Sequence, residues 1–270
     1  MKSAWVAPPL LLSAVLVLYP LALMLGQSLT DAAGQIGVGS FAALLGSSLF
    51  LRALWHTVAI ALAASAGCVL LGFVLALLLS FVPVPGARLI GRMIDTVIAL
   101  PTFLVALAFT FIYGSAGLLN GVAMRLTGAA APPIDFLYTI WGVILAEITV
   151  YTPFLMRPLL AAFSQIDPAQ IEVASSLGAG FWRIVWRVIL PAARPALLAG
   201  GSLCLLLTVN EFGVVFFIGA KGVVTLPLLV YDKAIQEFDY VAACAVAVLN
   251  VALSLALFGL YRALLARLER

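Results

Sequence analysis

Six long apolar stretches divide this chain of 270 residues, and they limit its fold more than any other feature. They cover approximately residues 4–29, 54–82, 93–113, 138–160, 194–219 and 241–264. A helix that crosses a bilayer needs about 20 mainly apolar residues, so each stretch is long enough to span. Only 9% of the residues are charged, whereas a soluble domain carries roughly a quarter. The sequence therefore predicts an all-α integral membrane protein with six transmembrane helices.

The first stretch could be mistaken for a secretory signal, because Lys2 precedes it. It is longer than the core of about 7 to 15 residues that such signals have, and more hydrophobic stretches follow it. We therefore expect a retained first helix. Because no segment between the stretches is long enough for an independent fold, residues 1–270 are expected to form a single transmembrane domain.

Basic residues are distributed unequally between alternate loops, and this predicts the orientation of the chain. Ten of them would fall on one side of the membrane: Lys2, Arg88, Arg92, Arg157, Arg183, Arg187, Arg194, Arg262, Arg267 and Arg270. Four would fall on the other side: Arg52, Arg125, Lys221 and Lys233. Lys and Arg concentrate in cytoplasmic loops, so the first side is assigned to the cytoplasm. Both termini (N-in, C-in) and the loop at residues 161–193 are then cytoplasmic.

The cytoplasmic loop carries two sets of helix signals. Asp167 is a favourable N-cap, and Pro168 suits the first position of a helix. Gly178 can adopt the left-handed backbone that commonly ends a helix. A second short helix is predicted from Phe181 to Leu190, closed by Pro191.

The second short helix is amphipathic. Its apolar residues recur at helical spacing on one face: Phe181, Ile184, Val185 and Val188. Arg183 and Arg187 lie on the other face, and the aromatic residues Phe181, Trp182 and Trp186 are expected to be exposed. Such a surface is unfavourable in water unless it docks on something. It could lie on the inner leaflet, with its arginines against anionic headgroups, or dock on a protein, and physical chemistry alone favours neither.

The spacing of residues in this loop resembles the EAA signature of ABC importer permeases, written E-A-A-x3-G-x9-I-x-L-P. The matching residues are Glu172, Val173, Ala174, Gly178, Val188, Leu190 and Pro191. Val173 and Val188 replace the alanine and isoleucine of the signature conservatively. The resemblance extends from about residue 50 to the end of the chain, and it implies the MetI-like permease fold.

The resemblance also implies partners and a location. The chain would be a multi-pass permease domain in the inner membrane of a bacterium, and its loop would contain a coupling helix that docks on a dimer of cytoplasmic ABC ATPases. A second permease subunit, identical or related, would complete the membrane part. A periplasmic or lipid-tethered binding protein would deliver solute to the outer loops near residues 30–52, 114–137 and 220–240. No nucleic acid is implied, and ATP and Mg would be bound by the ATPase, with no cofactor in this chain.

The substrate follows from a second resemblance. The segment that begins at Asn210, NEFGVVFFIGAKGVVTLPLLVYDKAIQEFDYVAACAVAVLN, is most similar to permeases for 2-aminoethylphosphonate. Permeases for sulfate, molybdate, ferric ion, thiamine and polyamines share the same outline and remain alternatives. An ion-coupled secondary transporter is a less favoured alternative, because it would not need the EAA element.

Four polar side chains in or beside the apolar stretches are candidates for the translocation path: Glu147, Asn210, Glu211 and Asn250. A charged side chain at the bilayer centre costs about 2.5 to 3.5 kcal/mol on insertion scales, so both acids require a partner or a function. Interhelical hydrogen bonding is favoured over solute contact for Glu147, and the two roles are balanced for Glu211. An acid at Glu211 could bind the ammonium group of an aminophosphonate.

No pattern in the sequence points to catalysis or to a metal site. His56 is the only histidine, and three isolated cysteines lie in apolar runs: Cys68, Cys204 and Cys244. The closest match to a phosphate-binding G-x-x-x-x-G-K-[ST] loop, Gly86 to Met93, has Arg92 and Met93 where lysine and a hydroxyl are required. The sequence predicts a transport subunit that is not an enzyme, with ATP hydrolysis performed by another chain.

Overall fold

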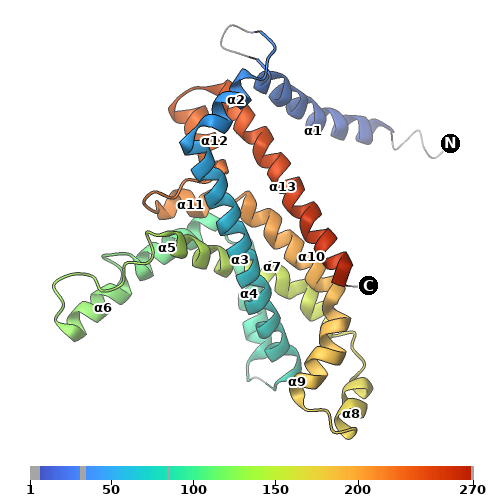
Figure 1. Cartoon of the computed structure of the whole chain (residues 1–270). Coiled ribbons are helices and arrows are strands. Elements are labelled where there is room, and N and C mark those ends of the chain that lie inside the picture. Colours follow the sequence, from blue (N-terminus) through green and yellow to red (C-terminus); the bar gives the residue numbers. More distant parts are fainter. Residues whose placement is uncertain (1–6, 31–34, 84, 269–270) are drawn as a thin grey trace. The chain divides into compact units, whose positions relative to one another are not determined.

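The computed structural model describes residues 7–30, 35–83 and 85–268, and it is built from helices (Figure 1). They are α1 (Ala7–Ser28), α2 (Gly39–Gly46), α3 (Ser48–Phe81), α4 (Ala87–Ala99), α5 (Thr102–Tyr113), α6 (Leu118–Thr127), α7 (Ile140–Phe163), α8 (Pro168–Ser176), α9 (Phe181–Ile184), η1 (Val185–Ile189), α10 (Leu190–Val209), α11 (Gly213–Ile218), α12 (Leu226–Tyr231), η2 (Asp232–Gln236) and α13 (Tyr240–Leu268). The elements η1 and η2 are single π-helical turns. Among the described residues no β-strand occurs, so the all-α prediction is confirmed.

Six helical stretches are long and apolar enough to cross a membrane, as the sequence predicted. They are Pro8–Ser28, Ser48–Phe81, Thr102–Thr127, Ile140–Phe163, Phe181–Val209 and Tyr240–Leu264. The orientation of the termini stays a prediction, and two of the charges on which it rests, Lys2 and Arg270, lie outside the described residues.

The third stretch does not have the predicted bounds. The prediction ran through residues 93–113, but the helix breaks between α4 and α5, and the apolar stretch continues from α5 into α6. The cause is Pro101, which disfavours helical backbone at the preceding residue. Leu100 is accordingly extended, with φ −81° and ψ 135°. The preceding helix α4 carries charged residues and holds Asp95 in an ion pair with Arg157 of α7.

The fifth stretch is also shifted relative to the predicted range of residues 194–219. Pro191 does not close the short helix that begins at Phe181, because the chain stays helical from there to Val209. In the π turn η1, the Leu190 N–H bonds to the Val185 carbonyl five residues back, and Pro191 follows in the first turn of α10. A proline has no backbone N–H to donate, and it is tolerated at this joint because the helical hydrogen-bond pattern changes there. The helix then ends at Val209, and a separate helix, α11, follows.

The chain divides into two compact units, and each is described by itself. The first unit comprises Met1–Thr57 and Val224–Leu255. Its core joins α2, the start of α3, α12 and the start of α13, through Leu44, Phe50, Ala53, Leu226, Leu229, Ala245 and Val246. A hydrogen bond of 2.8 Å from the Leu226 N–H to the Thr57 hydroxyl ties α12 to α3.

The second unit comprises Val58–Val223 and Ala256–Arg270, and α7 is its most buried long helix. Glycines allow α3 and α10 to approach α7 closely: Gly67 lies against Ile148, and both Gly72 and Gly200 lie against Leu155. A Cβ atom at Gly200 would lie 2.6 Å from Leu155 Cδ1 and 3.2 Å from Leu155 Cα. Small residues at such contacts are typical of helix packing in membranes.

The close contact at Gly200 predicts a stability effect. Replacing Gly200 with valine should lower the free energy of unfolding by about 1–3 kcal/mol, because the added side chain meets the backbone of α7 as well as a side chain. Reversible unfolding of the purified chain in mixed micelles would measure this loss. Ala199→Val is the matched control, since Ala199 is exposed on the same helix. Equal losses for the two variants would contradict the packing argument.

Candidate functional site

The helix α8 carries the first residues of the EAA-like signature. It begins as predicted, since Asp167 Oδ1 accepts a hydrogen bond of 2.9 Å from the Ala169 N–H and Pro168 occupies the first turn. No residue of α8 is buried, and Glu172 and Val173 are exposed. Figure 1 shows α8 at the end of its unit, beside α9. A helix without a buried face is not held by the core of its own unit, and its surface is available to a partner.

The turn after α8 depends on Gly178. Its φ is +83°, in the left-handed region that favours glycine. The Gly178 N–H bonds to the Ser175 carbonyl at 2.9 Å, and the Ala179 N–H bonds to the Ala174 carbonyl at 3.0 Å. An added Cβ at Gly178 would meet nothing within 4 Å, so the requirement for glycine comes from the backbone conformation and not from crowding. This geometry is the C-terminal cap that the sequence predicted.

Apolar side chains are exposed on both sides of this turn, and we call them the exposed apolar patch. It consists of Val173, Leu177, Phe181, Trp182 and Trp186, whose exposed fractions range from 52% to 82%. The rings of Phe181 and Trp182 pack edge to face, with centroids 5.3 Å apart. The prediction of exposed aromatic residues is confirmed.

The residues of the second short helix that are buried differ from those of the predicted apolar face. Of that face, Ile184 and Val185 are buried, Val188 is partly buried and Phe181 is exposed, and Ile189 is buried as well. The π turn η1 contains one more residue per turn than an α-helix, and it moves the buried face by one position.

The exposed segment is continuous with a long apolar helix. Val188 lies in η1, and Leu190 and Pro191 begin α10, where all three are partly buried. The chain is helical from Phe181 to Val209, so a displacement of α9 would reach α10 through hydrogen-bonded backbone. The residues of the EAA-like signature therefore lie on two sides of a joint: Glu172, Val173, Ala174 and Gly178 before α9, and Val188, Leu190 and Pro191 after it.

Glu211 lies at the far end of α10, in the break before α11, and is 6% exposed. Its Oε1 atom accepts hydrogen bonds from the Thr102 hydroxyl at 3.1 Å and from the Val214 N–H at 2.7 Å. Its Oε2 atom accepts a hydrogen bond from the Tyr151 hydroxyl. We call these four residues the Glu211 hub, because they connect α5, α7, α11 and the end of α10. Thr102 and Tyr151 were not predicted, since nothing local in the sequence indicates their contact with Glu211.

The other predicted path residues are placed separately. Glu147 is fully buried on α7, one turn before Tyr151, and neither carboxyl oxygen has a hydrogen-bond partner among the described residues. Asn210 is exposed, and its side chain donates to the Leu206 carbonyl at 2.8 Å. Asn250 is buried on α13 in the first unit. The structure thus brings Glu147 and the Glu211 hub together on one face of α7.

Six helices of membrane length, with the exposed EAA-like segment between the fourth and the fifth of them, match the outline of the membrane subunit of an ABC-type importer. The chain belongs to the family described as the binding-protein-dependent transport system inner membrane component, whose model matches residues 68–270. This assignment selects a transport permease over the secondary transporter that the composition also allowed.

Two relatives show the range of named substrates. A protein of Salmonella typhimurium, PhnU, is 60% identical over 258 residues, which cover 96% of this chain and 90% of that protein. Its name assigns it provisionally to a 2-aminoethylphosphonate transport system as a permease. The sulfate transport system permease protein CysT of Escherichia coli (strain K12) is 31% identical over 203 residues, covering 74% of this chain and 70% of that protein.

Solved structures share the fold at low sequence identity. A chain of a bacterial ABC transporter involved in the import of alginate has a TM-score of 0.81 and 19% identity, with 100% of this chain and 98% of that chain covered. A chain of the MetNI methionine ABC transporter has a TM-score of 0.62 and 20% identity, with 82% and 97% covered. The predicted MetI-like fold is confirmed.

Proposed function

We propose that this chain forms the solute path of an importer for 2-aminoethylphosphonate, or another small phosphonate, in the inner membrane of a bacterium. The support for the substrate is the identity of 60% to PhnU along nearly the whole chain, against 31% over a shorter region for the sulfate permease. Sulfate, molybdate, ferric ion, thiamine and polyamines are alternatives of lower rank. The predicted orientation places both termini in the cytoplasm.

The observation that carries the coupling role is the exposed segment from α8 to α9 and its unbroken connection to α10. We infer that a dimer of cytoplasmic ATPases, which would bind ATP and Mg, docks on α8 and the exposed apolar patch. Glu172 would pair there with a basic residue of the ATPase. A protein partner suits this surface better than a lipid surface does, because apolar side chains on α8 and the aromatic residues beyond the turn are exposed together.

The geometry suggests how movement would pass through the chain. Closure of the ATPase dimer would displace α8, and Gly178 would keep the angle between α8 and α9. The helix from Phe181 to Val209 would carry the displacement along α7 to the Glu211 hub, which connects α5, α7 and α11. A shift of this hub would then change the packing around the solute path.

The path itself would be lined in part by Glu147, Asn210, Glu211 and Asn250. For Glu211 the contacts favour a structural role in this conformation, because both carboxyl oxygens already bind protein donors. Glu147 has no such donors among the described residues, so it is the stronger candidate for contact with a cationic group that passes through the subunit. A second permease subunit and a solute-binding protein would complete the assembly.

Reconstitution tests the proposed function. The test uses liposomes that contain this chain, its partner ATPase and its binding protein. In them, 2-aminoethylphosphonate should stimulate ATP hydrolysis several-fold. The ATPase should also co-purify with the chain. Stimulation by sulfate alone would retain the mechanism and reject the substrate. Hydrolysis that no tested solute changes, without co-purification of the ATPase, would reject the proposed coupling.

A further inference from the structure

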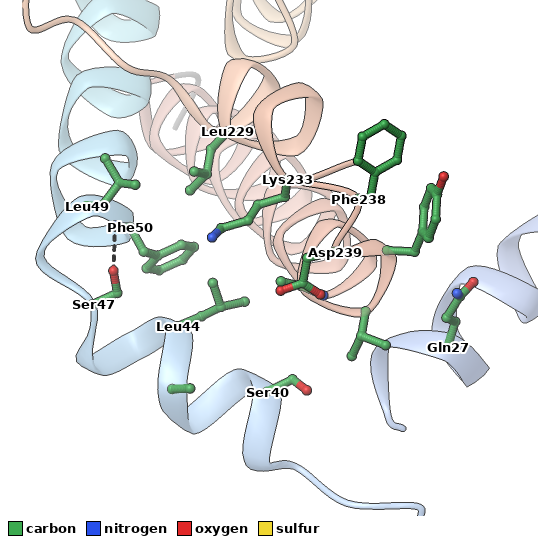
Figure 2. Close-up of a pocket in the computed structure, with 14 residues that line it drawn as sticks. Gln27, Ser40, Leu44, Ser47, Leu49, Phe50, Leu229, Lys233, Phe238 and Asp239 are labelled. Carbon is green, nitrogen blue, oxygen red and sulfur yellow. Dashed lines mark hydrogen bonds between the residues drawn. The ribbon is translucent and has the colours of Figure 1, made fainter. Parts of the chain in front are cut away.

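A pocket lies in the first unit, whereas the EAA-like signature and the Glu211 hub belong to the second unit. It has a volume of about 570 Å³ and is formed by α2, the start of α3, α12, η2 and the start of α13, with Gln27 of α1 at its edge (Figure 2). Sites for small molecules commonly have volumes of about 300–1,000 Å³, apolar walls and a few polar groups. Leu44, Phe50 and Leu229 form the apolar wall here.

Two opposite charges face this pocket from neighbouring parts of the chain. Figure 2 shows the Lys233 side chain, from η2, and the Asp239 carboxylate, which precedes α13, directed toward the same space. The backbone holds these residues together, because the Asp239 N–H donates to the Lys233 carbonyl at 2.8 Å. A ligand with one positive and one negative group would therefore find both complementary charges in this pocket.

The segment between the two charges has an unusual backbone. Phe238 has φ +57°, and it is the only non-glycine residue with a positive φ among those the structure describes. The π turn η2 precedes it, and the Glu237 N–H bonds back to the Asp232 carbonyl at 2.9 Å. Backbone strain and π turns cluster at binding sites, where surrounding contacts keep them in place. Phe238 also lines the pocket, so the strained residue and the two charges belong to one site.

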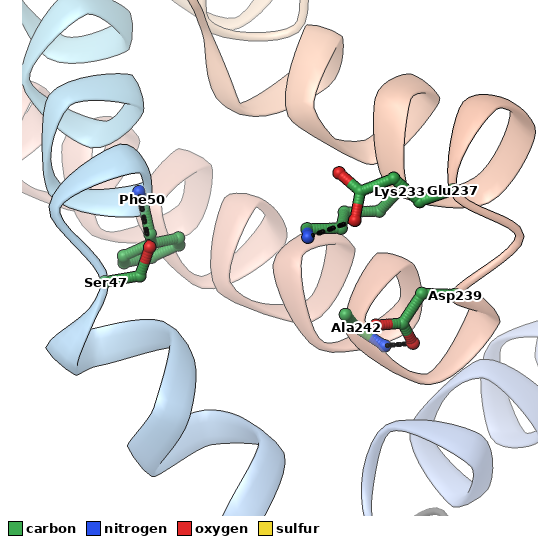
Figure 3. A network of polar contacts seen from close by, with 6 residues as sticks. All are labelled: Ser47, Phe50, Lys233, Glu237, Asp239 and Ala242. Carbon is green, nitrogen blue, oxygen red and sulfur yellow. Dashed lines mark hydrogen bonds and ion pairs between the residues drawn. The ribbon is translucent and has the colours of Figure 1, made fainter.

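Both charged groups have hydrogen-bonding capacity left for a ligand. The Lys233 ammonium donates to Glu237 Oε2 at 2.6 Å, and Asp239 Oδ1 accepts from the Ala242 N–H at 3.0 Å (Figure 3). An ammonium group has three donors and a carboxylate has two oxygens, so part of each is unused among the described residues. The Lys233–Glu237 pair is exposed at Glu237, and exposed ion pairs are weak, so a ligand anion competes readily for Lys233.

We propose that this pocket receives the free solute before it enters the membrane, with the phosphonate bound to Lys233 and the ammonium bound to Asp239. This inference rests on the proposed function, whose predicted orientation places residues 30–52 and 220–240 on the outer side. Phe238 and Tyr240 also line the pocket, and their aromatic rings would add attraction for the ammonium group. Sulfate would gain the contact with Lys233 but would be repelled by Asp239, so the pocket selects a zwitterion over a simple dianion.

Direct binding tests this site on the intact chain in lipid nanodiscs without the binding protein. Calorimetric titration with 2-aminoethylphosphonate should show saturable binding that Lys233→Met and Asp239→Asn each weaken about tenfold, the loss expected for one charge-assisted contact. Asparagine remains a good N-cap, so Asp239→Asn should leave α13 folded. Lys233→Arg should retain most of the affinity, and sulfate should not bind measurably.

Two further variants separate binding from folding. Glu237→Gln should strengthen binding about two- to threefold, because the ammonium of Lys233 loses its internal competitor, and damage to the fold would not produce a gain. Asp232→Asn is the matched control in the same π turn. Asp232 does not line the pocket, and its Oδ1 atom accepts a hydrogen bond of 2.7 Å from the Gln236 side chain. Burial raises the pKa of the Asp232 carboxyl, and the Glu237 carboxylate raises it further.

The outcomes distinguish this inference from the proposed function. If the reconstituted wild-type importer responds to 2-aminoethylphosphonate but the isolated chain shows no saturable binding, or binding that all variants share, the pocket is not a solute site and the function stands. Equal binding of sulfate would overturn the zwitterion assignment. If Lys233→Met weakens retention of the binding protein and leaves solute affinity unchanged, the surface is a docking site and the inference is wrong. An importer that responds to no phosphonate refutes the function itself.

Discussion

Replacing Gly178 with valine is expected to lower solute-stimulated ATP hydrolysis at least about tenfold while the chain stays folded. The φ of +83° at this position is strongly unfavourable for a β-branched residue, and such strain costs on the order of 1–3 kcal/mol. The turn would relax to another conformation and change the angle between α8 and α9. Liposomes containing the ATPase and the binding protein would show the loss as hydrolysis that no longer responds to solute.

Gly178→Asn is the control for this prediction, because asparagine tolerates left-handed backbone better than any residue with a branched Cβ. Neither variant should unfold the chain, since an added Cβ at this exposed position meets nothing within 4 Å. Asparagine should therefore retain most of the stimulation. A normal response from the valine variant, or an equal loss in both variants, would show that the conformation of this turn does not carry the coupling.

The segment from Asp167 to Gly178 could be predicted closely because its signals are local. Asp167, Pro168 and Gly178 act through neighbouring backbone groups, and the structure has the N-cap, the first-turn proline and the left-handed glycine at those positions. The error came one step later, at Pro191, which was expected to end a helix. Whether a proline ends a helix or is absorbed by a π turn depends on how the next helix packs, and that information is not local.

The number of membrane-length helices was predictable, but their ends were less so. Apolar length alone identifies a span. The break at Leu100 and Pro101 follows instead from the effect of a proline on the backbone of the residue before it. The polar residues Asn210 and Glu211 lay inside the predicted fifth stretch, although they mark the end of α10. In both cases a local signal for a helix end was present, but the length of the surrounding apolar stretch concealed it.

The Glu211 hub could not be predicted at all. Its hydroxyl donors lie 109 residues away at Thr102 and 60 residues away at Tyr151, and their meeting depends on how three helices pack. The pocket between Lys233 and Asp239 is a similar case, because it needs the strained backbone at Phe238 as well as the charges. Sequence reasoning identified Glu211 as a residue that requires partners, but only the fold identifies them.

Removing the Glu211 carboxylate is expected to destabilise the second unit by about 2–4 kcal/mol. In Glu211→Ala the Thr102 hydroxyl, the Tyr151 hydroxyl and the Val214 N–H all lose their acceptor in a buried site, and each unsatisfied group is unfavourable. The link between α10 and the helices α5 and α11 would weaken with it. Reversible unfolding in mixed micelles would measure the stability, and solute-stimulated hydrolysis by the same variant should fall because movement of α10 is no longer transmitted.

Glu211→Gln separates this structural role from contact with the solute. The amide oxygen can still accept from Thr102 and Val214, and the amide N–H can donate to the Tyr151 hydroxyl, which then reverses its role. Glutamine should therefore restore more than half of the lost stability and most of the transport. If Glu211→Gln is as stable as the wild type but transports poorly, the acid contacts the solute, and a hub that serves only to join helices is excluded. If Glu211→Ala is as stable as Glu211→Gln, the hydrogen bonds of the hub do not hold α10 to its neighbours.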